Sequence, residues 1–79
     1  MKKFKVWQGV ISDSGNGDVD VLVGKFDTFE EANKRFDEVK TDTKGWVKPF
    51  RNNYLATLLE EATDDETEIK VLDYFEMKF

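Results

Sequence analysis

A short basic and aromatic stretch has a composition suited to binding. Between positions 44 and 51, three cations are interleaved with two aromatic rings: Lys44, Trp46, Lys48, Phe50 and Arg51. In modules that bind single-stranded nucleic acid, bases stack on aromatic side chains while cations follow the phosphates. The stretch is therefore a candidate nucleic-acid or phosphate-binding patch, although the end of a helix followed by a loop would have the same composition.

The loop 13–20 is a candidate cation site because it is rich in side-chain oxygens, the ligands that Ca²⁺ prefers. Its possible ligands are Asp13, Asn16, Asp18 and Asp20. The spacing differs from an EF-hand loop, which needs ligands at its third and fifth positions, where this loop has Gly15 and Gly17. Asn16-Gly17 is also the dipeptide that best suits a hairpin turn. We interpret the loop as a turn and assign no metal ligand.

Several kinds of catalytic chemistry are excluded by composition. The chain has no histidine and no cysteine, so it can form neither a histidine-dependent triad nor a thiol nucleophile nor a Cys/His zinc site. Glycoside hydrolysis needs only two carboxylates, but they must flank a cleft, and a chain of 79 residues supports one thin core. We therefore expect no enzymatic activity and no cofactor.

Length and charge describe a small acidic protein. The 79 residues are expected to form one domain, 1–79, and the formal net charge is −5. An acidic chain has little general affinity for nucleic acid or anionic membranes, which are bound by clustered lysine and arginine. The sequence has no signal peptide and no apolar run near 18 residues, so we expect a cytoplasmic protein.

The segment from Asp27 to Gly45 predicts an amphipathic helix. Thr28 and Glu31 have the spacing of a capping box. An apolar stripe at helical spacing follows, made of Phe29, Ala32, Phe36 and Val39. Gly45 is the predicted stop.

Strand patterns surround this helix. Alternation predicts strands at 2–12, 19–26 and 68–78, the first two joined as a hairpin. The segment 54–62 fits either a strand paired with 68–78 or a second helix at 53–63; we favour the strand. The result is a β-β-α-β-β antiparallel sheet with the helix packed on one face. In element order alone it resembles the β-grasp of small immunoglobulin-binding domains.

Two surfaces are candidate protein interfaces. The sheet face away from the helix is predicted to expose Trp7, Leu22, Phe26 and Tyr74, and exposed apolar patches of this kind mark interfaces. An acidic edge is predicted from Glu60, Glu61, Asp64, Asp65, Glu66 and Glu68. The resulting hypothesis is a non-enzymatic domain that binds a protein partner or itself as a homodimer. It would suit a small inhibitor or adaptor of the type carried by phages and mobile elements.

Overall fold

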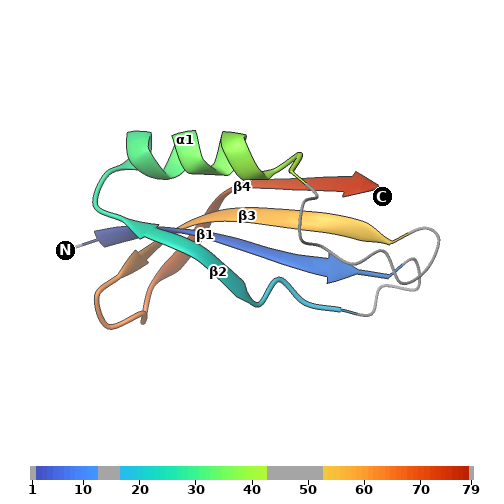
Figure 1. Ribbon diagram of the computed structural model, residues 1–79. Coiled ribbons are helices and arrows are strands. Elements are labelled where there is room, and N and C mark those ends of the chain that lie inside the picture. The colour runs from blue at the N-terminus through green and yellow to red at the C-terminus, as the bar shows by residue number, and fades with distance from the viewer. Residues whose placement is uncertain (1, 13–16, 43–52, 79) are drawn as a thin grey trace.

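The fold is a four-stranded sheet with one helix. The structure is a computed structural model, and it describes residues 2–12, 17–42 and 53–78. The elements are β1 (Lys2–Ile11), β2 (Val21–Phe26), α1 (Phe29–Val39), β3 (Tyr54–Thr63) and β4 (Ile69–Lys78). The predicted β-β-α-β-β order is confirmed (Figure 1).

The alternative of a second helix at 53–63 is wrong, because this segment is strand β3. β3 is a central strand, with β1 on one side and β4 on the other. A central strand that has buried residues on both faces loses the alternation of apolar and polar residues. Consecutive residues Leu55, Ala56 and Thr57 are all buried, which explains why the segment also fits a helical pattern.

The strands are arranged in the order β2-β1-β3-β4, and every neighbouring pair is antiparallel. The chain leaves the sheet after β2, runs through α1 across one face, and returns at β3 on the far side of β1 (Figure 1). The likeness to the β-grasp that the element order suggested is not confirmed.

The start of α1 follows the prediction. Thr28 is the N-cap, and its hydroxyl oxygen accepts a hydrogen bond from the backbone N–H of Glu31 at 3.3 Å. The hydroxyl in turn donates to the Glu31 carboxylate at 3.0 Å. The helix ends at Val39 with Lys40 as its C-cap, so it is shorter than predicted; Gly45 lies outside the described residues.

The core lies between α1 and the central strands. Ala32, Phe36 and Val39 of the helix pack with Val6 of β1 and Leu59 of β3. The apolar side chains packed around this centre are Phe4, Val23, Phe26, Leu72 and Phe75. Phe29, which the stripe placed in the core, is instead 44% exposed and meets Phe4 edge to face.

Each edge strand carries a β-bulge. In β2, Val6 pairs with Gly24 and Trp7 with Leu22, which leaves Val23 without a partner. In β4, Asp73 pairs with Leu59 and Val71 pairs with Glu60, so Leu72 between them has no partner. A bulge interrupts the alternation of side chains between the two faces. Both leftover residues pack against the core.

The bulge in β2 corrects one predicted interface residue. In an uninterrupted strand, Leu22 and Phe26 would share a face. The bulge between them places Phe26 opposite Phe4, and its ring packs against the core on the helix side. Phe26 is therefore not on the face that carries Leu22. The bulge in β4 has the same effect on Leu72, whose side chain packs against the core and not on the face of Tyr74.

A buried polar bridge joins α1 to the sheet. The side-chain amide of Gln8 donates to the backbone carbonyl of Val39 at 2.8 Å and to the hydroxyl of Thr57 at 3.2 Å. Gln8 and Thr57 are both buried. The Val39 carbonyl also accepts from the backbone N–H of Asp42 at 3.0 Å, so Gln8 is a second donor to this group in the last turn of the helix.

This bridge can be tested with Gln8→Leu. The substitution removes a donor from the buried Thr57 hydroxyl, so we expect a loss of about 1–3 kcal/mol in the free energy of unfolding. Adding Thr57→Val also removes the hydroxyl that has lost its donor, so the double variant should recover most of the lost free energy of unfolding. Urea denaturation of both single variants and the double variant measures the coupling. Additive losses would show that the two side chains do not act together.

Candidate functional site

The sheet face turned away from α1 carries a row of apolar side chains that crosses all four strands. Leu22 of β2 lies opposite Trp7 of β1, Trp7 lies opposite Leu58 of β3, and Leu58 lies opposite Tyr74 of β4. Directly paired residues share a face, so the row is continuous. Leu22 is 46% exposed and Tyr74 43%. We call this surface the open face.

Two further residues of β4 extend the row. Ile69 lies opposite Ala62, and Val71 lies opposite Glu60. Both are more than half exposed. The open face is therefore apolar at its centre and along much of β4. A contiguous cluster of exposed apolar side chains often marks a contact surface, whereas single exposed apolar side chains are common on any protein.

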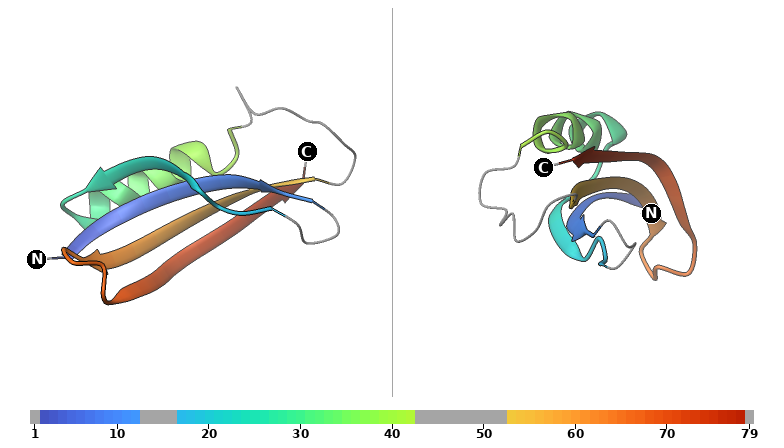
Figure 2. Two further views of the ribbon diagram at one scale, coloured as in Figure 1. Left: turned by 90° about the horizontal axis from the view of Figure 1, so that it is seen from below. Right: turned by 90° about the vertical axis from the view of Figure 1, so that its right-hand side faces the viewer.

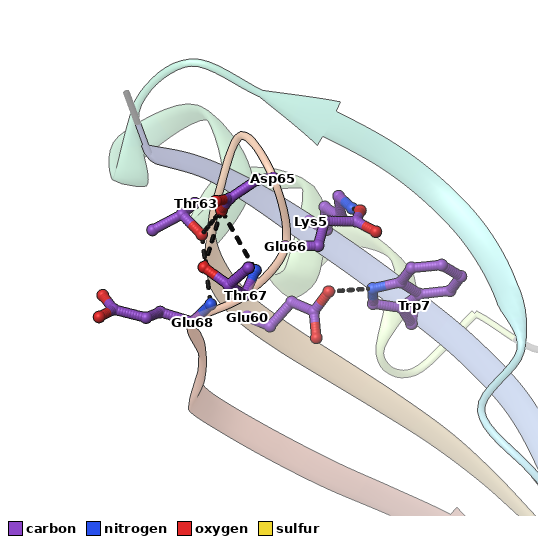
Figure 3. A network of polar contacts seen from close by, with 8 residues as sticks. All are labelled: Lys5, Trp7, Glu60, Thr63, Asp65, Glu66, Thr67 and Glu68. Atoms are coloured by element: carbon purple, nitrogen blue, oxygen red, sulfur yellow. Dashed lines mark hydrogen bonds and ion pairs between the residues drawn. The ribbon is translucent and has the colours of Figure 1, made fainter.

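Each end of the open face is bounded by chain that bends over it. At one end the backbone at Asp18 and Val19 passes so close to Gly9 that a Cβ there would lie 1.9 Å from the Asp18 carbonyl oxygen. Only glycine allows this approach. At the other end the β3–β4 turn brings Glu66 to Lys5, and the two side chains form an ion pair (Figure 3).

Polar contacts hold Trp7 in place on the open face. Its indole N–H donates to the Glu60 carboxylate at 2.7 Å (Figure 3). The Lys5 ammonium lies 5.9 Å from the centre of the indole ring. Lys5 and Glu60 are only 6% and 8% exposed, although charged residues are rarely this buried without partners. The Trp7 ring is thereby held in one orientation.

The β3–β4 turn is built around Asp65. Its carboxylate accepts hydrogen bonds from the hydroxyl of Thr63 at 2.7 Å and from the hydroxyl and backbone N–H of Thr67 at 2.9 and 3.2 Å (Figure 3). These bonds, led by the one from Thr63, lower the pKa of Asp65 below its ordinary value. The next residue, Glu66, has a backbone φ of 58°, a left-handed conformation that residues other than glycine rarely adopt. The turn thus directs Glu66 toward Lys5.

The predicted acidic edge is distributed over several surfaces. Glu60 lies on the open face, whereas Glu61 points to the opposite side and pairs with Lys2 at 2.8 Å. Consecutive residues in a strand point to opposite faces, which explains their separation. The remaining members lie in the β3–β4 turn or next to it: Asp64, Asp65, Glu66 and Glu68.

The structure brings together Trp7, Leu22 and Tyr74 from the predicted apolar interface, and it removes Phe26. It also adds Leu58, which the sequence pattern did not assign to this face. The missing signal was the pairing of this strand with β1, because that register places Leu58 beside Trp7.

A hollow lies on the open face near the β3–β4 turn. Its volume is about 250 Å³. Its walls are apolar at Trp7, Val19, Leu58 and Ile69, and charged at Lys5, Glu60 and Glu66. Pockets that bind drug-sized molecules have volumes of roughly 300–1,000 Å³. The hollow is therefore smaller than such pockets. Its volume is suited to one side chain of a larger ligand.

The other sequence candidates are only partly covered. The basic and aromatic patch 44–51 lies outside the described residues, as do Asp13 and Asn16 of the acidic loop, so both sites stay predictions. Asp18 is described, and its carboxylate accepts from the backbone N–H of Val19 at 2.7 Å. Within residues 2–12, 17–42 and 53–78, no group of three acidic, histidine or cysteine side chains is placed to hold a metal ion.

The ionisation of Tyr74 tests the environment of the open face. Burial raises the pKa of Tyr74 to about 12 from its ordinary value of 10.0, and the hydrogen bond from its hydroxyl to Glu76, 2.6 Å long, acts in the same direction. The folded state favours the neutral phenol, so this contribution to stability is complete below pH 10.0 and is lost as pH rises through about 12. Phenolate absorbance in a Tyr54→Phe background follows Tyr74 alone. Glu76→Gln should lower the pKa; an unchanged titration would contradict this assignment.

The low pKa of Asp65 makes a second pH prediction. A depressed folded-state pKa contributes stability that is present above 3.8 and is lost as pH falls through the folded value. We expect Asp65→Asn to lose less stability than the wild type as pH falls below 3.8. Thermal melts across this acidic range make the comparison. Parallel pH profiles for the two proteins would show that the turn does not depend on the Asp65 charge.

Comparison with known proteins provides no assignment. No family model, no curated protein and no solved structure matches this chain. Among the described residues, no helix has the length and hydrophobicity needed to span a membrane. The function is therefore inferred from the geometry of the open face.

Proposed function

We propose that this chain is a non-enzymatic protein-binding domain, of the inhibitor or adaptor type, and that the open face is its contact surface. The observation that carries the proposal is the apolar row Leu22, Trp7, Leu58 and Tyr74, which crosses the whole sheet and is not covered by α1. Aromatic residues are enriched at the centres of protein interfaces.

The size of the open face supports a protein partner. With strands of up to ten residues, the spacings in a sheet give this face an area on the order of 600 Å². Stable interfaces bury about 800 Å² on each partner. The open face and its flanking turns thus approach the area that a specific complex needs. The hollow is too small to enclose a typical metabolite.

Charge favours a different protein over a second copy. Each copy has a formal net charge of −5, and like charges of this size oppose self-association. A basic partner would be attracted instead, and complementary charge increases the association rate. We therefore propose a partner whose contact surface combines apolar and basic residues.

The matched pair Leu22→Ser and Val21→Ser tests this proposal. The two residues are neighbours in β2 with exposures of 46% and 47%. Val21 lies opposite Gln8 and so faces the helix side. Loss of an apolar side chain at an interface centre costs about 1 kcal/mol or more. We expect Leu22→Ser to weaken partner binding about fivefold or more, and Val21→Ser to leave it unchanged.

The partner is first captured from an extract of the source organism after nuclease treatment, and its affinity for each variant is then measured by titration calorimetry. Thermal melts check that both variants remain folded. Equal binding by the wild type and Leu22→Ser, or equal losses for both variants, would contradict the proposed surface. Light scattering measures the oligomeric state of the purified protein. A dimer would contradict the separate partner and would show that a second copy occupies the surface.

A further inference from the structure

We propose that the hollow beside Trp7 receives a basic side chain, most suitably an arginine, of the protein that the open face binds. The inference rests on the proposed function and specifies what the partner must present. Three features of the hollow support the inference: its size, its apolar walls, and the fact that its lining has more carboxylates than cations.

The walls of the hollow match the stem of a long cationic side chain. Val19, Leu58 and Ile69 line it together with the indole of Trp7. Arginine and lysine bury their hydrocarbon stems on apolar surface while the charged head reaches polar groups. A volume of about 250 Å³ has room for one such side chain. The aromatic wall adds a favourable surface, because cations are attracted to the faces of indole rings.

The charges in the hollow are not balanced from within. Glu60 and Glu66 both line it, and Lys5 is its internal cation. Lys5, which lies opposite Glu60 in the sheet, forms its ion pair with Glu66. The contact described for Glu60 is the hydrogen bond from the neutral indole N–H of Trp7, so the lining holds two carboxylates and one cation. Glu60 is 8% exposed, and an excess of negative charge at a site with so little exposure is unfavourable. An added cation would balance that excess.

The second oxygen of Glu60 is the point of contact. The hydrogen bond from Trp7 is made to Oε1, and within the described part of the chain no hydrogen bond to Oε2 is formed. In the same part of the chain, no fully buried side-chain oxygen or nitrogen lacks a partner. Glu60 is among the residues that line the hollow, so a cation that enters the hollow comes close to this carboxylate. Trp7 fixes the carboxylate in advance, which lowers the entropy cost of binding.

Arginine fits this site better than the other candidates. Its planar guanidinium carries five N–H donors and is more weakly hydrated than an ammonium group, so it can stack on Trp7 while it donates to Glu60. Anions would be repelled by the two carboxylates. A metal ion would need a group of ligands that the described residues do not offer.

A pair of peptides tests the inference on the wild-type fold. The probes are a capped tripeptide with arginine between two leucines and the same peptide with citrulline, which keeps the shape but has no charge. The indole N–H resonance of Trp7 is the readout, because this group donates to Glu60; Trp46→Phe removes the other indole signal. We expect the arginine peptide to shift the resonance with a dissociation constant on the order of 1 mM, and the citrulline peptide to bind about tenfold more weakly.

Variants assign the effect to the hollow. Glu60→Gln keeps an oxygen acceptor for Trp7 and removes the charge, so it should weaken the arginine peptide to the level of the citrulline peptide. Glu66→Gln provides a second test if Glu60→Gln does not fold. Glu61→Gln is the matched control, because Glu61 lies on the other face and pairs with Lys2. This control should bind both peptides as the wild type does.

The outcomes separate the inference from the proposed function. Equal binding of the two peptides, no binding of either, or no effect of both Glu60→Gln and Glu66→Gln would overturn the arginine site. If the captured partner still depends on Leu22 in that case, the open face binds proteins without this recognition. If the arginine peptide binds as expected and the partner is insensitive to Leu22→Ser, the cation site stands and the proposed surface is wrong.

Discussion

The packing of α1 on the sheet is the constraint from which the other features of the structure follow. One helix of eleven residues covers one face of the sheet, and it does so through Ala32, Phe36 and Val39 against the central pair Val6 and Leu59. The core is a single layer between helix and sheet. The opposite face has no second helix among the described residues, so its apolar side chains stay at the surface. In a domain this small, the core and the exposed apolar surface therefore lie on the two opposite faces of one sheet.

The two β-bulges reinforce this division. Val6 and Leu59 are direct partners in the two central strands, and the bulges at Val23 and Leu72 lie on either side of that pair, one in each edge strand. Both send an additional apolar side chain into the core. Bulges also increase twist and make edge strands less able to pair with other chains. The curved sheet seen end-on in Figure 2 is consistent with that effect.

Polar contacts on the two faces serve different purposes. Under the helix, Gln8 joins the last turn of α1 to the buried hydroxyl of Thr57. On the open face, Trp7 and Glu60 hold each other near the surface, while Lys5 is occupied by Glu66. Buried charges add little to stability compared with apolar packing. On the open face these contacts leave an indole and a carboxylate that are held in place at the rim of the hollow.

The sequence by itself determined the helix start, the first hairpin, and three members of the open face: Trp7, Leu22 and Tyr74. These follow from local rules of capping and alternation, which depend on neighbours along the chain. The sequence favoured a strand at 54–62 but left a helix at 53–63 open, and the structure decided for the strand. Only the tertiary structure decided that Phe26 belongs to the core, that Leu58 completes the row, and that Glu60 and Glu66 flank one hollow. The bulges and the pairing of β3 with β1 produce these results. Both depend on contacts between residues far apart in the chain, which a single sequence does not reveal.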